Sequence, residues 1–139
     1  MLLEKTRVVL NDIKDECLEN VFKRHNRLTR PTRAAIGATD LTMVVPDSFA
    51  GSTTGCFVPE GLDVGKLVKS LRDDFGVTLA GGQDQWKGQV VRIAHLGYVD
   101  TFDAIITISA LEVALKKMRH NITLGKGVSA APEIPLEGY

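Results

Sequence analysis

The sequence predicts an α+β two-layer domain, in which a small mixed or antiparallel sheet carries helices mainly on one face. Short β-rich runs arrive in adjacent pairs between helical segments, in the order helix, strand, strand, helix, strand, strand, helix, tail. A chain of 139 residues, 44% of them hydrophobic, is long enough for one core and too short for two. We expect one folded domain over residues 1–120 and an extended or loosely ordered tail over residues 121–139, which are rich in Gly, Pro and Ala.

The first expected element is a long amphipathic helix over residues 11–35. Apolar residues recur every three to four positions from Ile13 to Leu28, and most charged residues fall on the other faces. Pro31 lies inside this segment and lacks the amide hydrogen that a helix uses. The proline predicts a kink or a break near Arg30, because the residue before proline disfavours helical geometry.

Two strands and a second helix are expected next. Residues 41–45 and 55–58 are β-rich runs separated by a polar loop. Asp63 is placed as the N-cap of a helix whose apolar residues continue at helical spacing to Phe75. Gly76 follows as a C-terminal stop.

The second half of the chain predicts two more strands and a third helix. Residues 77–80 and 89–95 are the expected strands, joined by a glycine-bounded loop over residues 81–88. Asp100 and the aspartate three residues later predict a capping box ahead of a helix that reaches about Met118. This helix is apolar on most sides, so we expect it to be well buried, or to be covered by something that this chain lacks.

Charge and composition exclude several classes of function. Seventeen basic and seventeen acidic residues leave no net charge to gather nucleic acid or anionic lipid. No segment has the roughly 18 consecutive apolar residues of a membrane helix, and no secretory signal is visible. Cys17 and Cys56 have no metal-ligand spacing; a disulfide remains possible, and a cytoplasmic location fits equally well.

No self-sufficient catalytic motif is present. The sequence contains no Walker loop, GxGxxG, HExxH or GxSxG pattern. His25, His95 and His120 are scattered along the chain, and lone histidines in such settings usually have structural roles. We therefore expect neither a complete catalytic set nor a metal site within this chain.

Arg92 is the candidate binding residue. It lies between Val91 and Ile93 in an apolar strand, directly after the glycine-rich loop. A buried arginine is costly unless an anion meets it, and its planar fork suits a carboxylate. Gly81 and Gly82 would let the backbone approach a ligand closely. From the residues alone, two interpretations stay open: Arg92 binds a substrate anion, or it faces water or a structural acid.

The segment 77–100, with its AGGQ…KG…RIAHLG pattern, resembles the C-terminal domain of class V aminotransferases. The resemblance is to the alanine–glyoxylate and serine–pyruvate (or serine–glyoxylate) group, which includes proteins labelled as a soluble hydrogenase subunit. Less specific matches over residues 17–25, 58–62 and 103–115 extend the resemblance to roughly residues 13–118. It implies the small domain of a fold-type I enzyme that depends on pyridoxal phosphate and acts on small amino acids and 2-oxo acids.

The resemblance also implies roles for individual residues. The arginine of the matching strand holds the substrate's α-carboxylate, so Arg92 is carried over as the substrate-binding residue. The glycine-rich loop lies near the mouth of the active site, so Gly81 and Gly82 are weaker substrate-binding candidates. His95 falls within the motif, where a packing role and a contact with ligand both remain open. The family works as a homodimer with sites near the subunit interface.

The cofactor machinery of the family lies elsewhere. Its Schiff-base lysine, the aspartate that pairs with the pyridine nitrogen and most phosphate ligands precede the matching region, in a larger domain. None of the lysines in this chain has the setting of a Schiff-base lysine. We expect the chain alone to be inactive and to bind no cofactor, with the large domain as its missing partner.

Two alternatives remain open. One is a cysteine desulfurase, also of class V, which uses a nucleophilic cysteine on a mobile loop; Cys56 in an expected strand and Cys17 on a helix fit this poorly. The other is a stand-alone module, derived from this domain, that binds small molecules or proteins. Apolar surface left uncovered by a missing domain would favour self-association.

Overall fold

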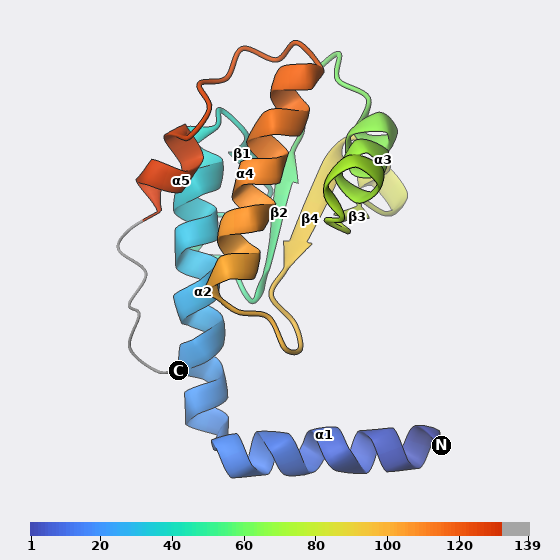
Figure 1. The fold of residues 1–139 in the computed structure, drawn as a ribbon, viewed down its shortest axis with the longest axis vertical. Coiled ribbons are helices and arrows are strands. Elements are labelled where there is room, and N and C mark those ends of the chain that lie inside the picture. The colour runs from blue at the N-terminus through green and yellow to red at the C-terminus, as the bar shows by residue number, and fades with distance from the viewer. Residues whose placement is uncertain (132–139) are drawn as a thin grey trace.

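The computed structural model describes residues 1–131, which fold into a sheet with helices packed on it (Figure 1). The expected α+β fold is confirmed. Its elements are α1 (Leu2–Glu16), α2 (Leu18–Ala38), β1 (Thr42–Met43), η1 (Asp47–Phe49), β2 (Thr53–Phe57), α3 (Val64–Phe75), β3 (Ala80–Gly81), η2 (Asp84–Trp86), β4 (Val90–Ala94), α4 (Thr101–Lys117) and α5 (Lys126–Ala130).

The sheet has the strand order β1-β2-β4-β3, and every neighbouring pair is antiparallel. The central pair places Gly55 of β2 opposite Arg92 of β4, and Ala80 of β3 lies on the other side of the same arginine. Successive residues of a strand point to opposite faces. Val91 and Ile93 are buried and belong to the core, whereas Arg92 between them is half-buried. Arg92 therefore lies on the face opposite the core.

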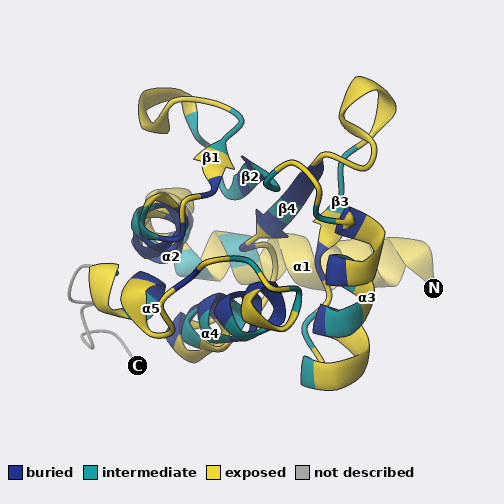
Figure 2. Ribbon diagram, turned by 90° about the horizontal axis from the view of Figure 1, so that it is seen from above, coloured by how far each residue is buried: buried dark blue, intermediate teal, exposed yellow. Residues whose placement is uncertain are grey.

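The core fills the space between one face of the sheet and the helices. Figure 2 shows α2, α3 and α4 on this side, while the loops that contain η1 and η2 rise beside the other face. The contributions of α3 and α4 are apolar side chains at helical spacing, which bury one stripe of each helix. Fully or almost fully buried members are Ile36, Cys56, Leu67, Leu71, Val91, Leu111, Ala114 and Leu115.

The long N-terminal helical segment breaks at Cys17 and not near Arg30, where we expected it. Cys17 has φ 70° and joins α1 to α2, which run in clearly different directions (Figure 1). Pro31 lies inside α2 and is buried there, with Leu28 and Ile36 on the same buried side. The burial of these side chains outweighs the single hydrogen bond that proline removes, so the helix continues through Pro31.

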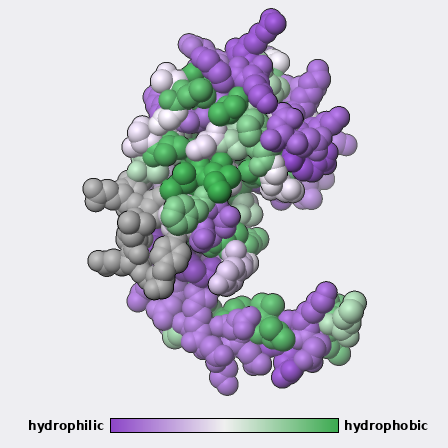
Figure 3. Space-filling model, viewed as in Figure 1, coloured by the Kyte–Doolittle hydropathy of each residue, from purple (hydrophilic) through white to green (hydrophobic). Residues whose placement is uncertain are grey.

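Helix α1 is an exposed arm. None of its residues is buried, and Leu2, Leu3, Val9 and Leu10 are all more than half exposed. Figure 3 shows α1 beneath a hollow that separates it from the body of the molecule. A helix with this much exposed apolar surface is typical of a segment that packs against another part of a larger protein. None of the helices in residues 1–131 is long and apolar enough to span a membrane.

The expected helix caps are present. The Asp63 side chain accepts a hydrogen bond from the backbone N–H of Lys66 at 3.0 Å, and Gly76 ends α3 in the left-handed conformation at φ 69°. Asp100 and Asp103 form a reciprocal capping box at the start of α4, each accepting from the other's backbone N–H at 3.0 Å. These local signals fix where both helices begin.

The third strand is shorter and later than expected. The sequence predicts a strand over residues 77–80. The N–H of Val77 instead donates to the carbonyl oxygen of Leu71 at 2.9 Å, which holds the start of this segment against the end of α3. The chain reaches the sheet at Ala80 and pairs there only through β3. The first strand is likewise reduced to β1, Thr42–Met43.

The stretch expected to be extended or loose contains a helix. Helix α5 packs against α2 and α4, and the carboxylate of Glu112 on α4 accepts the backbone N–H groups of Gly125 and Gly127. Glu112 is only 2% exposed, and a Cβ on Gly127 would lie 2.9 Å from its Oε1. A buried carboxylate satisfied by two amides holds this stretch against the body, which the Gly- and Pro-rich composition did not reveal. Residues 132–139 of the predicted tail lie outside the described residues.

Candidate functional site

Arg92 stands in the middle of the sheet on the face away from the core. Its Nε donates a hydrogen bond to the carbonyl oxygen of Gly81 at 2.9 Å. In residues 1–131 it forms no ion pair, and its terminal nitrogens have no acceptor. The sequence left open that Arg92 pairs with a structural acid. No such pair is found in the described part of the chain. The free edge of the guanidinium is the edge that can take a carboxylate through two parallel hydrogen bonds.

The residues beside Arg92 are small. Gly55 and Ala80 are its partners on the two neighbouring strands. The space beside Gly55 is taken by Val44, since a Cβ added to Gly55 would lie 3.2 Å from Val44 Cγ2. Sequence reasoning missed Gly55 and Ala80, because only the register of the sheet brings them beside Arg92.

The two candidate glycines have different surroundings. Gly81 orients Arg92 through its carbonyl oxygen, and a Cβ added to it would meet nothing within 4 Å. Gly82 donates its N–H to Val90 at 2.7 Å, and a Cβ there would lie 2.2 Å from the carbonyl oxygen of Trp86. Gly82 is therefore required by the tight turn through η2. The structure brings Gly81 to Arg92, and it gives Gly82 a role in shaping the loop.

His95 lies on the other side of the sheet from Arg92. Its ring is 2% exposed, with Nε2 2.8 Å from Thr32 Oγ1 of α2 and Nδ1 3.4 Å from the carbonyl oxygen of Ser52. Burial lowers the pKa of His95, and the charges of His25 and Arg33 lower it further, while the hydrogen bond to Ser52 opposes them. This ring contacts α2 and β2, and it does not face the guanidinium of Arg92.

Neither cysteine has the setting of a catalytic nucleophile. Cys56 is fully buried in β2, and burial raises the pKa of its thiol to about 12. Cys17 is exposed at the joint between α1 and α2, where its Sγ donates to the carboxylate of Glu19 at 2.8 Å. A nucleophilic cysteine needs a lowered pKa in an electropositive setting, so these surroundings argue against a desulfurase.

Other groups that could carry chemistry are not assembled in residues 1–131. No group of three or more His, Cys, Asp or Glu side chains in this range could hold a metal ion. All of the lysines are exposed on the surface. A Schiff-base lysine must instead be held and desolvated against the cofactor ring.

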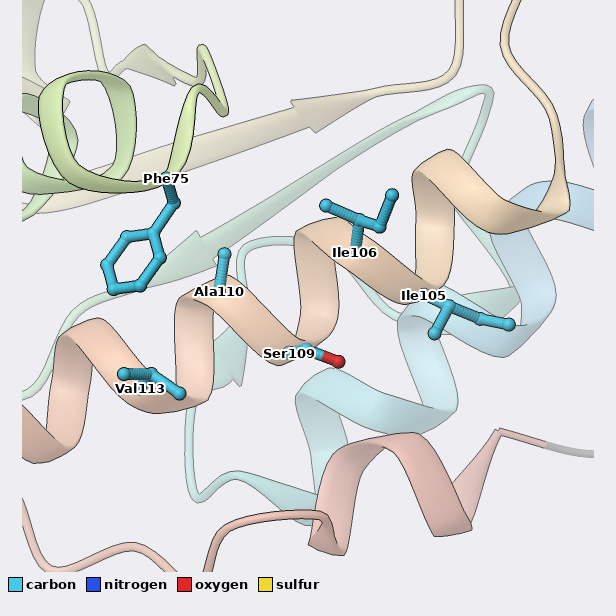
Figure 4. A pocket seen from close by; sticks show the side chains of 6 residues that line it. All are labelled: Phe75, Ile105, Ile106, Ser109, Ala110 and Val113. Carbon is cyan, nitrogen blue, oxygen red and sulfur yellow. The ribbon is translucent and has the colours of Figure 1, made fainter.

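A shallow apolar groove runs between α3 and α4 (Figure 4). Ser109 supplies the only hydroxyl group of its lining, and no lining side chain is charged. Figure 3 shows the hydrophobic surface gathered over α4, which confirms that this helix has an uncovered apolar side. The groove holds no group able to transfer a proton or bind an anion. Its lining residues are Phe75, Ile105, Ile106, Ser109, Ala110 and Val113.

Comparison with known proteins shows which enzymes the chain is similar to. No protein-family model matches the sequence. The chain is 38% identical over 129 residues to the small subunit of the soluble hydrogenase of Synechococcus sp. (strain PCC 6716), covering 92% of this chain and 34% of that protein. It is 34% identical over 134 residues to the serine–glyoxylate aminotransferase of Hyphomicrobium methylovorum, covering 95% of this chain and 33% of that protein.

A solved structure gives the same result for the fold. The pyridoxamine–pyruvate aminotransferase from Mesorhizobium loti superimposes with a TM-score of 0.86 at 30% identity, over 91% of this chain and 33% of that one. The chain thus spans about a third of the length of the proteins that it matches. The resemblance seen in the sequence is confirmed: the chain is similar in sequence and fold to the C-terminal third of class V aminotransferases, their small domain.

Proposed function

We propose that this chain provides the carboxylate-binding part of a pyridoxal-phosphate-dependent aminotransferase that acts on small amino acids and 2-oxo acids. The observation that carries the proposal is the setting of Arg92. It is half-buried at the centre of the sheet, and its Nε donates to the carbonyl oxygen of Gly81. Its terminal nitrogens have no acceptor in residues 1–131, and its partners on the neighbouring strands are the small residues Gly55 and Ala80. An arginine held in this way is pre-organised for a planar anion.

The geometry sets how a carboxylate would approach. The Gly81 carbonyl occupies Nε–H, so the two terminal nitrogens are left to donate to the two carboxylate oxygens. Fixing Nε also restricts the side chain before substrate arrives, which lowers the entropy lost on binding. Arg92 would thereby orient the amino or oxo group next to the carboxylate toward the rest of the enzyme. Pyridoxal phosphate, bound outside this chain, would supply the electron sink for the reaction.

The rest of the enzyme would dock at the elbow of the chain, which we define as α1, the start of α2 and the loop after β4. Apolar side chains that are more than half exposed gather in these segments. The hollow between α1 and the body leaves room for a further domain (Figure 3). The exposed apolar residues of the elbow are Leu2, Leu3, Val9, Leu10, Leu18, Phe22, Leu96 and Tyr98.

Without that domain the chain would be inactive and would self-associate through its exposed apolar surface, whereas a homodimer is proposed for the whole enzyme. Sedimentation of the 139-residue chain at several concentrations tests the self-association. A concentration-dependent rise in mass is expected. A monomer at every concentration would count against self-association and against the docking surface.

A chimera tests the proposed function. The matching third of the Hyphomicrobium methylovorum serine–glyoxylate aminotransferase would be replaced by this chain, and transamination would be measured with serine and glyoxylate. The expected result is a soluble chimera with the absorbance of bound pyridoxal phosphate and measurable turnover. A chimera that folds and binds the cofactor but transfers no amino group would reject the proposal.

A further inference from the structure

Polar side chains lie buried between α2 and the end of β4, where an apolar contact would be the simpler solution. Thr32 is 0% exposed and His95 is 2% exposed, and they meet through Oγ1 and Nε2 at 2.8 Å. A polar group in such a place destabilises the fold unless it has a hydrogen-bond partner. This contact is therefore a specific one, and its donors and acceptors can be counted.

A neutral ring satisfies the short contact in either tautomer. If Nε2 carries the proton, it donates to Thr32 Oγ1, whose hydroxyl donates in turn to the carbonyl oxygen of Leu28 at 3.1 Å. If Nδ1 carries the proton, it donates to the carbonyl oxygen of Ser52 at 3.4 Å, and the Thr32 hydroxyl donates to Nε2. In both cases the hydrogen bond between Thr32 and His95 joins helix α2 to the ring.

This chain of hydrogen bonds joins α2 to the strand that carries Arg92. His95 follows Arg92 by three positions, and its backbone N–H bonds to the Ser52 carbonyl at 3.1 Å. A second contact from the same helix, Arg24 Nη1 to the Gly97 carbonyl at 3.3 Å, lies just beyond. Helix α2 thus holds the end of β4 at two points, and it leads directly into the exposed arm α1.

We propose that Thr32 and His95 are a positioning pair, which fixes the end of β4 against α2 and so sets the place of the Arg92 guanidinium. The inference rests on the proposed role of Arg92 in carboxylate binding. Neither residue touches the substrate; both act through the strand. Removing the hydroxyl would leave Nε2 buried without a hydrogen-bond partner and loosen the strand end three residues from Arg92.

The chain offers a matched set of variants. T32V keeps the volume of the side chain and removes the hydroxyl, and T32S keeps the hydroxyl. T29V is the control, because Thr29 is equally buried one turn earlier on α2 and its hydroxyl bonds only to carbonyls of its own helix. H95Q provides a second route, since its side-chain amide can form a hydrogen bond with Thr32 without an ionisable ring.

The test is nuclear magnetic resonance on the 139-residue chain, with acetate as the probe. In T32V we expect a shifted Arg92 Nε–H signal, amide exchange at residues 93–95 that is faster by about tenfold, and acetate binding weaker by about threefold, the scale of a slightly misplaced binding group. T32S and T29V should behave as the unmodified chain does.

Two results separate this inference from the proposed function. If T32V changes the His95 ring signals but leaves the Arg92 side-chain signal as in the unmodified chain, the pair has a local role only and the inference is wrong. If acetate shifts no Arg92 signal in the unmodified chain, carboxylate binding fails, while the Arg92 signal of free T32V still decides the positioning role. Should T32V not fold, H95Q and H95L are compared in the same way.

Discussion

The Nε of Arg92 lies 2.9 Å from the carbonyl oxygen of Gly81, across the β3–β4 pairing at the edge of the glycine-rich loop. Two sequence candidates therefore meet in one contact, with a backbone carbonyl as the partner. The bond occupies one side of the guanidinium and leaves the other side for a ligand. The loop and the arginine form a single unit in which the conformation of one sets the orientation of the other.

The loop should tolerate a methyl group at one glycine and not at the other. Gly82→Ala would place Cβ 2.2 Å from the Trp86 carbonyl oxygen, whereas Gly81→Ala meets nothing within 4 Å. We expect Gly82→Ala to lower the free energy of unfolding by about 1–3 kcal/mol, as forced shifts in packed sites do. Gly81→Ala should change it by less than about 1 kcal/mol. Urea denaturation of both variants checks this, and equal losses would contradict the described turn.

The buried carboxylate of Glu112 should contribute measurably to stability. Its two oxygens accept the N–H groups of Gly125 and Gly127, and a glutamine can accept only one of them while its NH₂ faces the other. Glu112→Gln is expected to cost about 2–3 kcal/mol, the scale of a lost hydrogen bond to a charged group together with an unsatisfied donor. Thermal unfolding measures this, with the exposed Glu60→Gln as control. Equal stability of the two variants would mean that the α5 segment is held in another way.

Acid should destabilise the fold through His95. Burial lowers its pKa in the folded state below the value near 6.5 of the unfolded chain, so the unfolded chain takes up the proton first. The stabilising contribution is complete above about pH 6.5 and is lost as the pH falls from there toward the folded-state pKa. Urea midpoints at pH 7.5 and pH 5.5 measure the effect. The decrease should be smaller in H95Q, and an equal decrease would assign the acid sensitivity to other groups.

The two thiols should differ in reactivity. Cys56 is fully buried, with a pKa raised to about 12, and Cys17 is exposed at a helix joint. Since the thiolate is the reactive form, a thiol reagent at pH 8 should modify one cysteine in the folded chain and both in denaturant. Cys17→Ser should abolish the modification of the folded chain. Rapid modification of Cys56 would reopen the desulfurase alternative.

Local signals allowed much of the fold to be predicted. The caps at Asp63 and Asp100 and the stop at Gly76 come from residue types at fixed positions, so the structure reproduces them. The helix joint was misplaced, because Cys17 carries no sequence signal for a positive φ while Pro31 carries a strong signal for a break. The start of α5 was missed because the carboxylate that holds it lies on α4, more than ten residues earlier.

The candidate site could be predicted from the sequence only in part. Arg92 could be singled out because a charge in an apolar strand needs a partner. Gly55 and Ala80 could not, since they reach Arg92 only through the register of three strands. Thr32 meets His95 across 63 positions in the sequence, and neither residue had a pattern to link it to the other.

The binding of the substrate carboxylate by Arg92 can be tested through the kinetics of the chimeric aminotransferase. Arg92→Ala should raise KM for both carboxylate substrates about 100-fold, the scale of losing one bidentate charged partner, and Arg92→Lys should fall between it and the unmodified enzyme. Arg72→Ala is the matched control, because Arg72 is an exposed arginine of α3 that pairs with Asp73. We expect a large rise in KM for Arg92→Ala and none for Arg72→Ala. Unchanged KM values in an active Arg92→Ala chimera would contradict it.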